Sequence, residues 1–131
     1  MAILIQGVVV QGQQLGRKLG FPTANIALPS EPKCKDGVYV AGVEIEGDKR
    51  EYLAVANLGS NPSVGGCKRR LEVHIIDYNG SPLYGKELKV TLKRYLRGET
   101  HFTTLEELKS QIQRDILSAK EQCLRGEVDE K

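Results

Sequence analysis

The stretch RLEVHIID, residues 70–77, has the clearest structural pattern in the chain. Leu71, Val73 and Ile75 occupy every second position, with more polar residues between them. Side chains of a strand alternate between its two faces, so this period of two predicts a strand with one buried face. We take this strand as the centre of the fold and look for its partners on both sides.

Further strand-like segments, rich in β-branched residues, lie before and after it, and turn signals separate them. Glu46-Gly47-Asp48 and Asn79-Gly80 are two of these signals. The predicted additional strands are residues 3–10, 38–45, 52–58 and 87–95. About five or six antiparallel strands are therefore expected.

The period changes from two to between three and four near residue 103, which predicts an amphipathic helix over about 104–124. Thr103 or Thr104 is expected to cap it, with Glu106 or Glu107 at the capping-box position. The tail, 125–131, is expected to fray. Because closure removes exposed strand edges, we predict a mainly β protein in which a barrel packs against this C-terminal helix.

Composition narrows the possible partners. A chain of 131 residues fits a single domain, 1–131, and its net charge of +2 predicts neither a nucleic-acid nor a membrane partner. The three cysteines are widely separated and have no zinc-binding spacing. We expect a cytoplasmic monomer.

The segment GRKLGFPTAN, residues 16–25, is the first candidate for chemistry. Glycines around Arg17 and Lys18 allow close approach of backbone and cations to phosphates. If Pro22 starts an extended segment, Thr23 and Asn25 place two neutral oxygens on one face, about 7 Å apart, where they suit Mg²⁺ shared with phosphate. A surface turn with a Thr/Asn backbone cap explains the same residues.

Two other features allow both a functional and an ordinary reading. Glu72 is a candidate general base at a cavity mouth, or a solvated residue on the outer face of its strand. His74 shares its face, but no third metal ligand accompanies the pair. Arg97 and Phe102, in the link to the helix, are candidates for contact with a planar ligand, or for an ordinary helix approach with a salt bridge.

Taken in order, several segments resemble the riboflavin kinase family, including the kinase module of the bacterial bifunctional riboflavin kinase/FAD synthetase. The resemblance covers about residues 5–120, and LGFPTAN is its most specific motif. The matching segments are GVVVQG at 7–12, GRKLGFPTANI at 16–26, GVY at 37–39, ANLG at 56–59, LEVH at 71–74, LYGK at 83–86 and LRGE at 96–99, followed by Phe102, Gln111-Ile112 and Asp115.

This resemblance implies a six-stranded antiparallel Greek-key β-barrel with a C-terminal α-helix. It also implies transfer of the γ-phosphate of ATP, with Mg²⁺, to the 5′-hydroxyl of riboflavin, giving FMN. Glu72 would be the catalytic base, Thr23 and Asn25 the metal ligands, and Arg97 and Phe102 flavin-side residues. The nucleotide would contact Gly16, Arg17, Lys18, Pro22, Thr23 and Asn25.

Two departures from the family accompany this resemblance. The segment GSNPSV, residues 59–64, carries Asn and Ser where bacterial members usually have an Arg-Pro-Thr type sequence. The HxGH-type motif of the nucleotidyltransferase half is absent from the sequence, so FAD synthesis is not expected.

Two alternative functions compete with a kinase. One is a non-catalytic flavin- or nucleotide-binding barrel with a regulatory role, although such a copy has little reason to keep Thr23, Asn25 and Glu72 together. The other is a nucleic-acid-binding barrel, for which only the cluster at residues 68–70 offers a basic patch.

Overall fold

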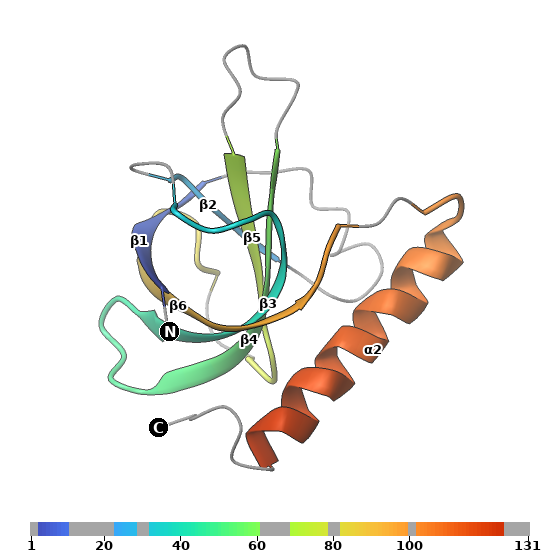
Figure 1. Ribbon diagram of the computed structural model, residues 1–131. Coiled ribbons are helices and arrows are strands. Elements are labelled where there is room, and N and C mark those ends of the chain that lie inside the picture. The colour runs from blue at the N-terminus through green and yellow to red at the C-terminus, as the bar shows by residue number, and fades with distance from the viewer. Residues whose placement is uncertain are drawn as a thin grey trace.

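The computed structural model describes residues 3–10, 23–28, 32–60, 69–78, 82–99 and 102–124. Within these residues, antiparallel strands close into a barrel, and helix α2 lies along its outside (Figure 1). The strands are β1 (Ile3–Val10), β2 (Ala24–Ile26), β3 (Gly37–Ile45), β4 (Glu51–Ser60), β5 (Arg69–Ile75) and β6 (Glu87–Arg97), and α2 spans Leu105–Leu124. The predicted mainly β fold, a six-stranded barrel with a C-terminal helix, is confirmed.

The strand order around the barrel is β1-β2-β5-β4-β3-β6. Consecutive strands β3, β4 and β5 pair as neighbours, whereas β5 then pairs with the earlier strand β2, as in a Greek key. Strand β6 pairs with both β3 and β1 and so closes the sheet. Closure leaves no free edge among the described strands.

Strand boundaries follow the sequence pattern closely. The first strand has the predicted bounds, and β3, β4 and β6 extend the predicted segments by one to three residues at one or both ends. Strand β5 ends at Ile75, two residues early, because Asp77 adopts a left-handed conformation (φ 59°) in the following turn. Strand β2 is only three residues long, too short to show a period in the sequence.

Alternate residues of the strands fill the interior of the barrel. The largest fully buried side chains are aliphatic, as expected for a close-packed core. The interior core consists of Ile5, Val9, Ala24, Ile26, Tyr39, Ala41, Val43, Ile45, Ala54, Ala56, Leu58, Leu71, Val73, Ile75, Leu88, Val90 and Leu92. The residues between them point outward.

A second, smaller core forms on the outer surface, where α2 lies against β4. It contains Val40 of β3, Leu53 of β4, Ile76 of the turn after β5 and Ala119 of α2, with Val55, Leu96, Ile116 and Cys123 at its margin. One side of the barrel is thus covered by the helix. The described part of the chain contains no helix long and apolar enough to cross a membrane.

The start of α2 has the predicted cap. The Thr104 hydroxyl accepts a hydrogen bond from the backbone N–H of Glu107 (3.1 Å). In return, the Glu107 carboxylate accepts bonds from the backbone N–H and hydroxyl of Thr103, and these bonds lower the pKa of Glu107. The ionised Glu107 carboxylate therefore stabilises the folded state at pH values above its ordinary pKa. This stabilisation is lost as the pH falls through the lowered pKa of the folded state.

A close approach at Gly7 fixes the position of β2. A Cβ at Gly7 would contact the backbone oxygen of Ala27 and would lie 2.8 Å from Cγ2 of Ile26. The Ala27 N–H also donates to the Val8 oxygen (3.0 Å). Strand β2 therefore lies so close to β1 that only glycine fits at position 7.

We predict that Gly7→Ala lowers the free energy of unfolding by about 2 kcal/mol, because backbone atoms must move to admit the methyl group. Gly42→Ala is the comparison: its Cβ would meet the ends of two ion-paired side chains, the Glu51 carboxylate at 2.5 Å and Lys93 Cε at 3.0 Å, rather than backbone atoms. Urea denaturation measures both changes. Equal effects of the two substitutions would contradict the close approach of β1 and β2.

Candidate active site

The strand register places three polar side chains side by side on the outer face of the barrel. Asn25 of β2 lies directly opposite Glu72 of β5, and Glu72 lies directly opposite Asn57 of β4. The residues that alternate with them, such as Val73, belong to the interior core. Because opposed residues point to the same face, the two amides flank the carboxylate. We call Asn25, Glu72 and Asn57 the polar row.

Beyond the polar row, the same line of opposed positions continues across two more strands. Asn57 lies opposite Val38 of β3, and Val38 lies opposite Arg97 of β6. Adjacent strands are about 4.8 Å apart, so three strand steps separate Glu72 from Arg97 by roughly 14 Å. Asn25, Glu72 and Arg97, which the sequence analysis singled out, thus lie along one line of opposed positions, although they are far apart along the chain.

The predicted metal ligands lie at one end of this row. Thr23 is half-buried and immediately precedes β2, two residues before Asn25. Asn25 is only 4% exposed, and no described residue donates a hydrogen bond to its Oδ1. A buried acceptor that lacks a donor fits a cation ligand, so the donor set suits Mg²⁺.

Glu72, the candidate base, is accessible from outside. Its side chain is 28% exposed, and Arg70 Nη2 lies 3.6 Å from its Oε1. This separation makes an ion pair but not a hydrogen bond. The Glu72 carboxylate is therefore partly exposed, and Arg70 does not hold it by a hydrogen bond. It can accept a proton from a hydroxyl group placed between the two amides.

His74 lies two residues beyond Glu72 but belongs to a different environment. It is opposite Val55, at the margin of the core beneath α2. Among the residues that the structure describes, no three His, Cys, Asp or Glu side chains gather as a metal site.

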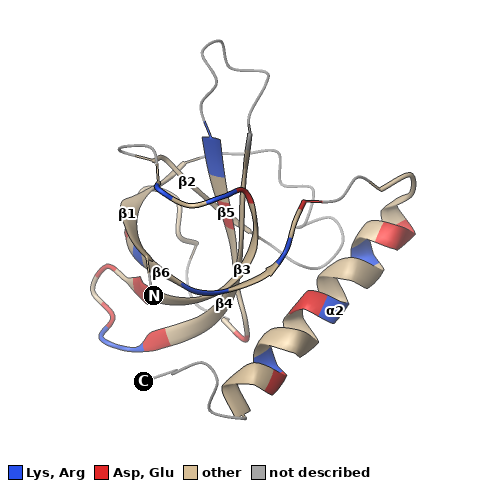
Figure 2. Ribbon diagram, viewed as in Figure 1, with Lys and Arg blue, Asp and Glu red and all other residues tan. Residues whose placement is uncertain are grey.

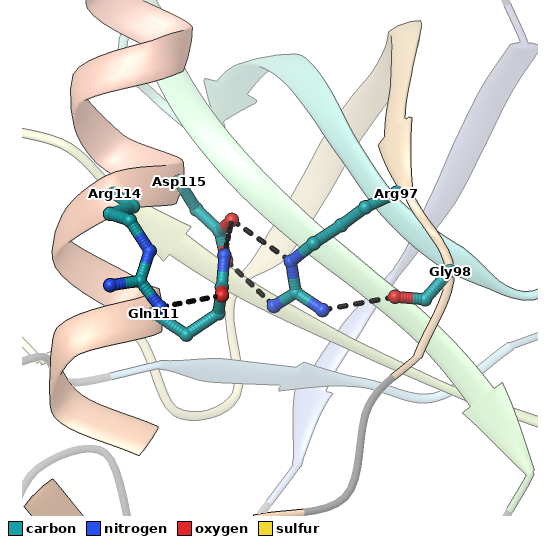
Figure 3. A network of polar contacts seen from close by, with 5 residues as sticks. All are labelled: Arg97, Gly98, Gln111, Arg114 and Asp115. Carbon is teal, nitrogen blue, oxygen red and sulfur yellow. Dashed lines mark hydrogen bonds and ion pairs between the residues drawn. The ribbon is translucent and has the colours of Figure 1, made fainter. Parts of the chain in front are cut away.

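Arg97 is engaged with the helix (Figure 3). Its Nε and Nη2 donate to the two carboxylate oxygens of Asp115 (3.0 and 2.8 Å), and its Nη1 donates to the Gly98 oxygen. Gln111 also donates to Asp115 (3.0 Å), and Arg114 donates to Gln111. The fork-to-fork pair anchors α2 at the end of the polar row.

A salt bridge near the helix was the ordinary reading of Arg97 in the sequence, but its partner, Asp115, was not identified there. The available signal was Asp115, a charged residue between Ile112 and Ile116 on the apolar face of the helix. A buried carboxylate needs a cation, and Asp115 is 6% exposed. Phe102 is half-buried in the link before α2 and is not a member of the row.

Tyr39 supports the sheet from the inner side. Burial, followed by the nearby Cys34 thiol, raises the pKa of Tyr39 to about 12. Its hydroxyl donates to the Lys35 oxygen (2.6 Å), and its ring meets the Tyr95 ring edge-on at 5.3 Å. Tyr39 therefore stays protonated at neutral pH and does not compete with Glu72 as a base.

Four of the predicted nucleotide-binding residues, Gly16, Arg17, Lys18 and Pro22, lie outside the described residues. Most of the segment 59–64, where the sequence departs from the bacterial pattern, also lies outside them. The described site is thus the polar row, Thr23 and the Arg97 anchor.

A family model for riboflavin kinase matches residues 1–123. The chain belongs to the riboflavin kinase family. The bifunctional riboflavin kinase/FMN adenylyltransferase of Escherichia coli (strain K12) is 44% identical over 117 residues, which are 89% of this chain and 37% of that protein. This chain thus spans just over a third of that relative's length.

Two further matches bear on fold and on partners. The RNA-binding riboflavin kinase RibR of Bacillus subtilis (strain 168) is 39% identical over 114 residues, 86% of this chain and 48% of that protein. The crystal structure of riboflavin kinase from Trypanosoma brucei has a TM-score of 0.74 at 22% identity, over 98% of this chain and 81% of that one. The second match supports the barrel fold.

We predict that Asp115→Ala lowers the free energy of unfolding by about 3 kcal/mol, because it leaves the Arg97 guanidinium without its carboxylate. The control is Lys120→Ala, which removes an exposed ion pair to Asp77 (3.7 Å) and should cost under about 1 kcal/mol. Thermal and urea denaturation compare the two. Similar losses would show that Arg97 and Asp115 do not anchor the helix.

Proposed function

We propose that the chain is an ATP-dependent riboflavin kinase that converts riboflavin to FMN. The observation that carries this proposal is the position of Glu72 directly opposite Asn25, which brings a candidate base beside a candidate metal ligand. Family membership supplies the substrates, riboflavin and ATP.

In the proposed reaction, the 5′-oxygen of riboflavin forms a bond to the γ-phosphorus of ATP. The bond between that phosphorus and the β,γ-bridging oxygen breaks, and ADP leaves. The proton of the 5′-hydroxyl passes to Glu72. Phosphoryl transfer requires mainly positioning and charge stabilisation, which a rigid barrel provides.

Mg²⁺, bound with ATP, would neutralise charge on the phosphates. Thr23 and Asn25 would hold it through neutral oxygens, and the phosphates would supply the negative ligands. Gly16, Arg17, Lys18 and Pro22 are proposed to contact the nucleotide, and Arg97 and Phe102 the flavin side. Because Arg97 is paired with Asp115, we propose that it contributes to the flavin side indirectly, by holding α2 in place.

We also propose that the chain binds no nucleic acid, although RibR carries RNA binding in its name. In the basic cluster at 68–70, Arg69 donates to Asp36 and to two backbone oxygens, and Arg70 pairs with Glu72. Basic and acidic positions are interspersed along α2 (Figure 2). Strand β6 carries more basic positions, but its Lys93 pairs with Glu51 and its Arg97 with Asp115. A monomeric state and a cytoplasmic location stay predictions.

The test is an assay for FMN by chromatography after incubation with riboflavin, ATP and Mg²⁺, with a reaction lacking ATP as the blank. FMN formation is the expected result. Binding of riboflavin and MgADP without FMN would instead favour the non-catalytic, regulatory barrel. Absence of both binding and product would reject a flavin-related function.

Glu72→Gln should lower turnover by about 10²- to 10⁴-fold, because the amide cannot accept the hydroxyl proton. Riboflavin and MgADP affinities should change little. Glu44→Gln is the matched control, since Glu44 is an exposed acid on β3 and should tolerate the change. Undiminished turnover in Glu72→Gln would remove Glu72 from the reaction.

Thr23→Ala should weaken MgADP binding about tenfold or more, because one oxygen ligand is lost. Isothermal titration calorimetry measures this affinity. When EDTA replaces Mg²⁺, the ADP affinity of Thr23→Ala should differ little from that of the wild-type chain. Thr91→Ala, on β6 and outside the polar row, is the control. Equal MgADP affinity in all three proteins would contradict the assignment of Thr23.

A further inference from the structure

Two buried amide oxygens flank Glu72, and only one of them has a proposed ligand. No described residue donates a hydrogen bond to Asn25 Oδ1 or to Asn57 Oδ1. The proposed Mg²⁺ would account for the first. Buried acceptors in native proteins are usually satisfied, and Asn57 differs from the other such acceptor, Gln122, in lying directly opposite Glu72, so a donor is expected there.

Among the described residues, the neighbours of Asn57 do not supply that donor. Glu72, opposite it on β5, is acceptor-only when ionised, and Val38, opposite it on β3, is apolar. Two residues along β4, Gly59 has no side chain, and the carboxylate of Glu99, another acceptor, packs against it. Arg70 lies diagonally across from Asn57, but its guanidinium approaches Glu72.

A hydroxyl group of the substrate meets this requirement. Opposed residues of an antiparallel pair have Cβ atoms about 5 Å apart, so Glu72 and Asn57 present two acceptors side by side. The ribityl chain of riboflavin carries hydroxyls on adjacent carbons. One such pair can therefore donate to both acceptors at once.

We propose that Asn57 is a substrate-positioning residue whose Oδ1 accepts a hydrogen bond from the ribityl 4′-hydroxyl while Glu72 receives the proton of the 5′-hydroxyl. This inference rests on the proposed kinase function. It makes the 4′-hydroxyl a specificity determinant, because a substrate without it leaves the Asn57 oxygen buried and unpaired.

The test compares riboflavin with 4′-deoxyriboflavin in the wild-type chain and in Asn57→Leu, a change of nearly the same shape. In the wild-type chain, loss of the 4′-hydroxyl should lower kcat/KM about tenfold or more. Asn57→Leu should lower kcat/KM for riboflavin by a similar factor but leave that for 4′-deoxyriboflavin nearly unchanged. A parallel loss on both substrates would overturn the proposal, as would no loss on either.

Gln122 provides a matched control, because its Oε1 is also buried without a described donor but lies in the last turn of α2. Gln122→Met should alter neither substrate's kcat/KM. Asn57→Leu should keep or raise the urea midpoint, since it removes an unpaired buried acceptor. If Asn57→Leu does not fold, Asn57→Ser replaces it, with a loss confined to riboflavin still expected.

Two additional measurements separate the alternatives. MgADP affinity should be equal in the wild-type chain and Asn57→Leu; a weaker affinity would assign Asn57 to the metal and overturn the proposal. If the wild-type chain forms no FMN, the kinase function fails, and flavin fluorescence titration then tests Asn57. If Asn57→Leu and loss of the 4′-hydroxyl weaken flavin binding equally, and the two changes together weaken it no further, the contact is supported. If the two effects add, the contact is rejected.

Discussion

The register between β2, β5 and β4 is the constraint on which the candidate site depends. It sets Asn25 and Asn57 directly opposite Glu72, and it keeps Val73 and its neighbours in the core. A slip of one residue would reverse both faces, burying the carboxylate and exposing aliphatic side chains. The free energy of core burial therefore holds the polar row in place, even though no member of the row contributes to the interior core.

The outer surface of the barrel is divided between packing and chemistry. Helix α2 covers the part around Val40, Leu53 and Ile76, and the anchor between Arg97 and Asp115 fixes it beside the row. A bidentate pair resists rotation of the helix more than a single contact does. The same strands thus carry an apolar patch under α2 and, a few residues away, the polar groups of the site.

Local pattern in the sequence was sufficient for the strands and the helix, because alternation and helical period are local properties. It was insufficient for β2, whose three residues become a strand only through pairing with β1 and β5. Glu72 was ambiguous for the same reason: its outward orientation follows from the sequence, but its position between two amides follows from register. Asn57 and the anchor of Arg97 required partners about 15 to 18 residues away, which no local pattern specifies.

The row uses amides on both sides of its single carboxylate, and charge explains this choice. Aspartates at 25 and 57 would place like charges directly opposite Glu72, which destabilises a sheet. They would also add negative charge where a triphosphate is proposed to bind. Asparagine keeps the oxygen and removes the charge, and without a substrate the cost is an unpaired buried acceptor. Under the proposed function, the cation and the hydroxyl donor would relieve this unfavourable interaction on binding, so that stability would be exchanged for affinity at these positions.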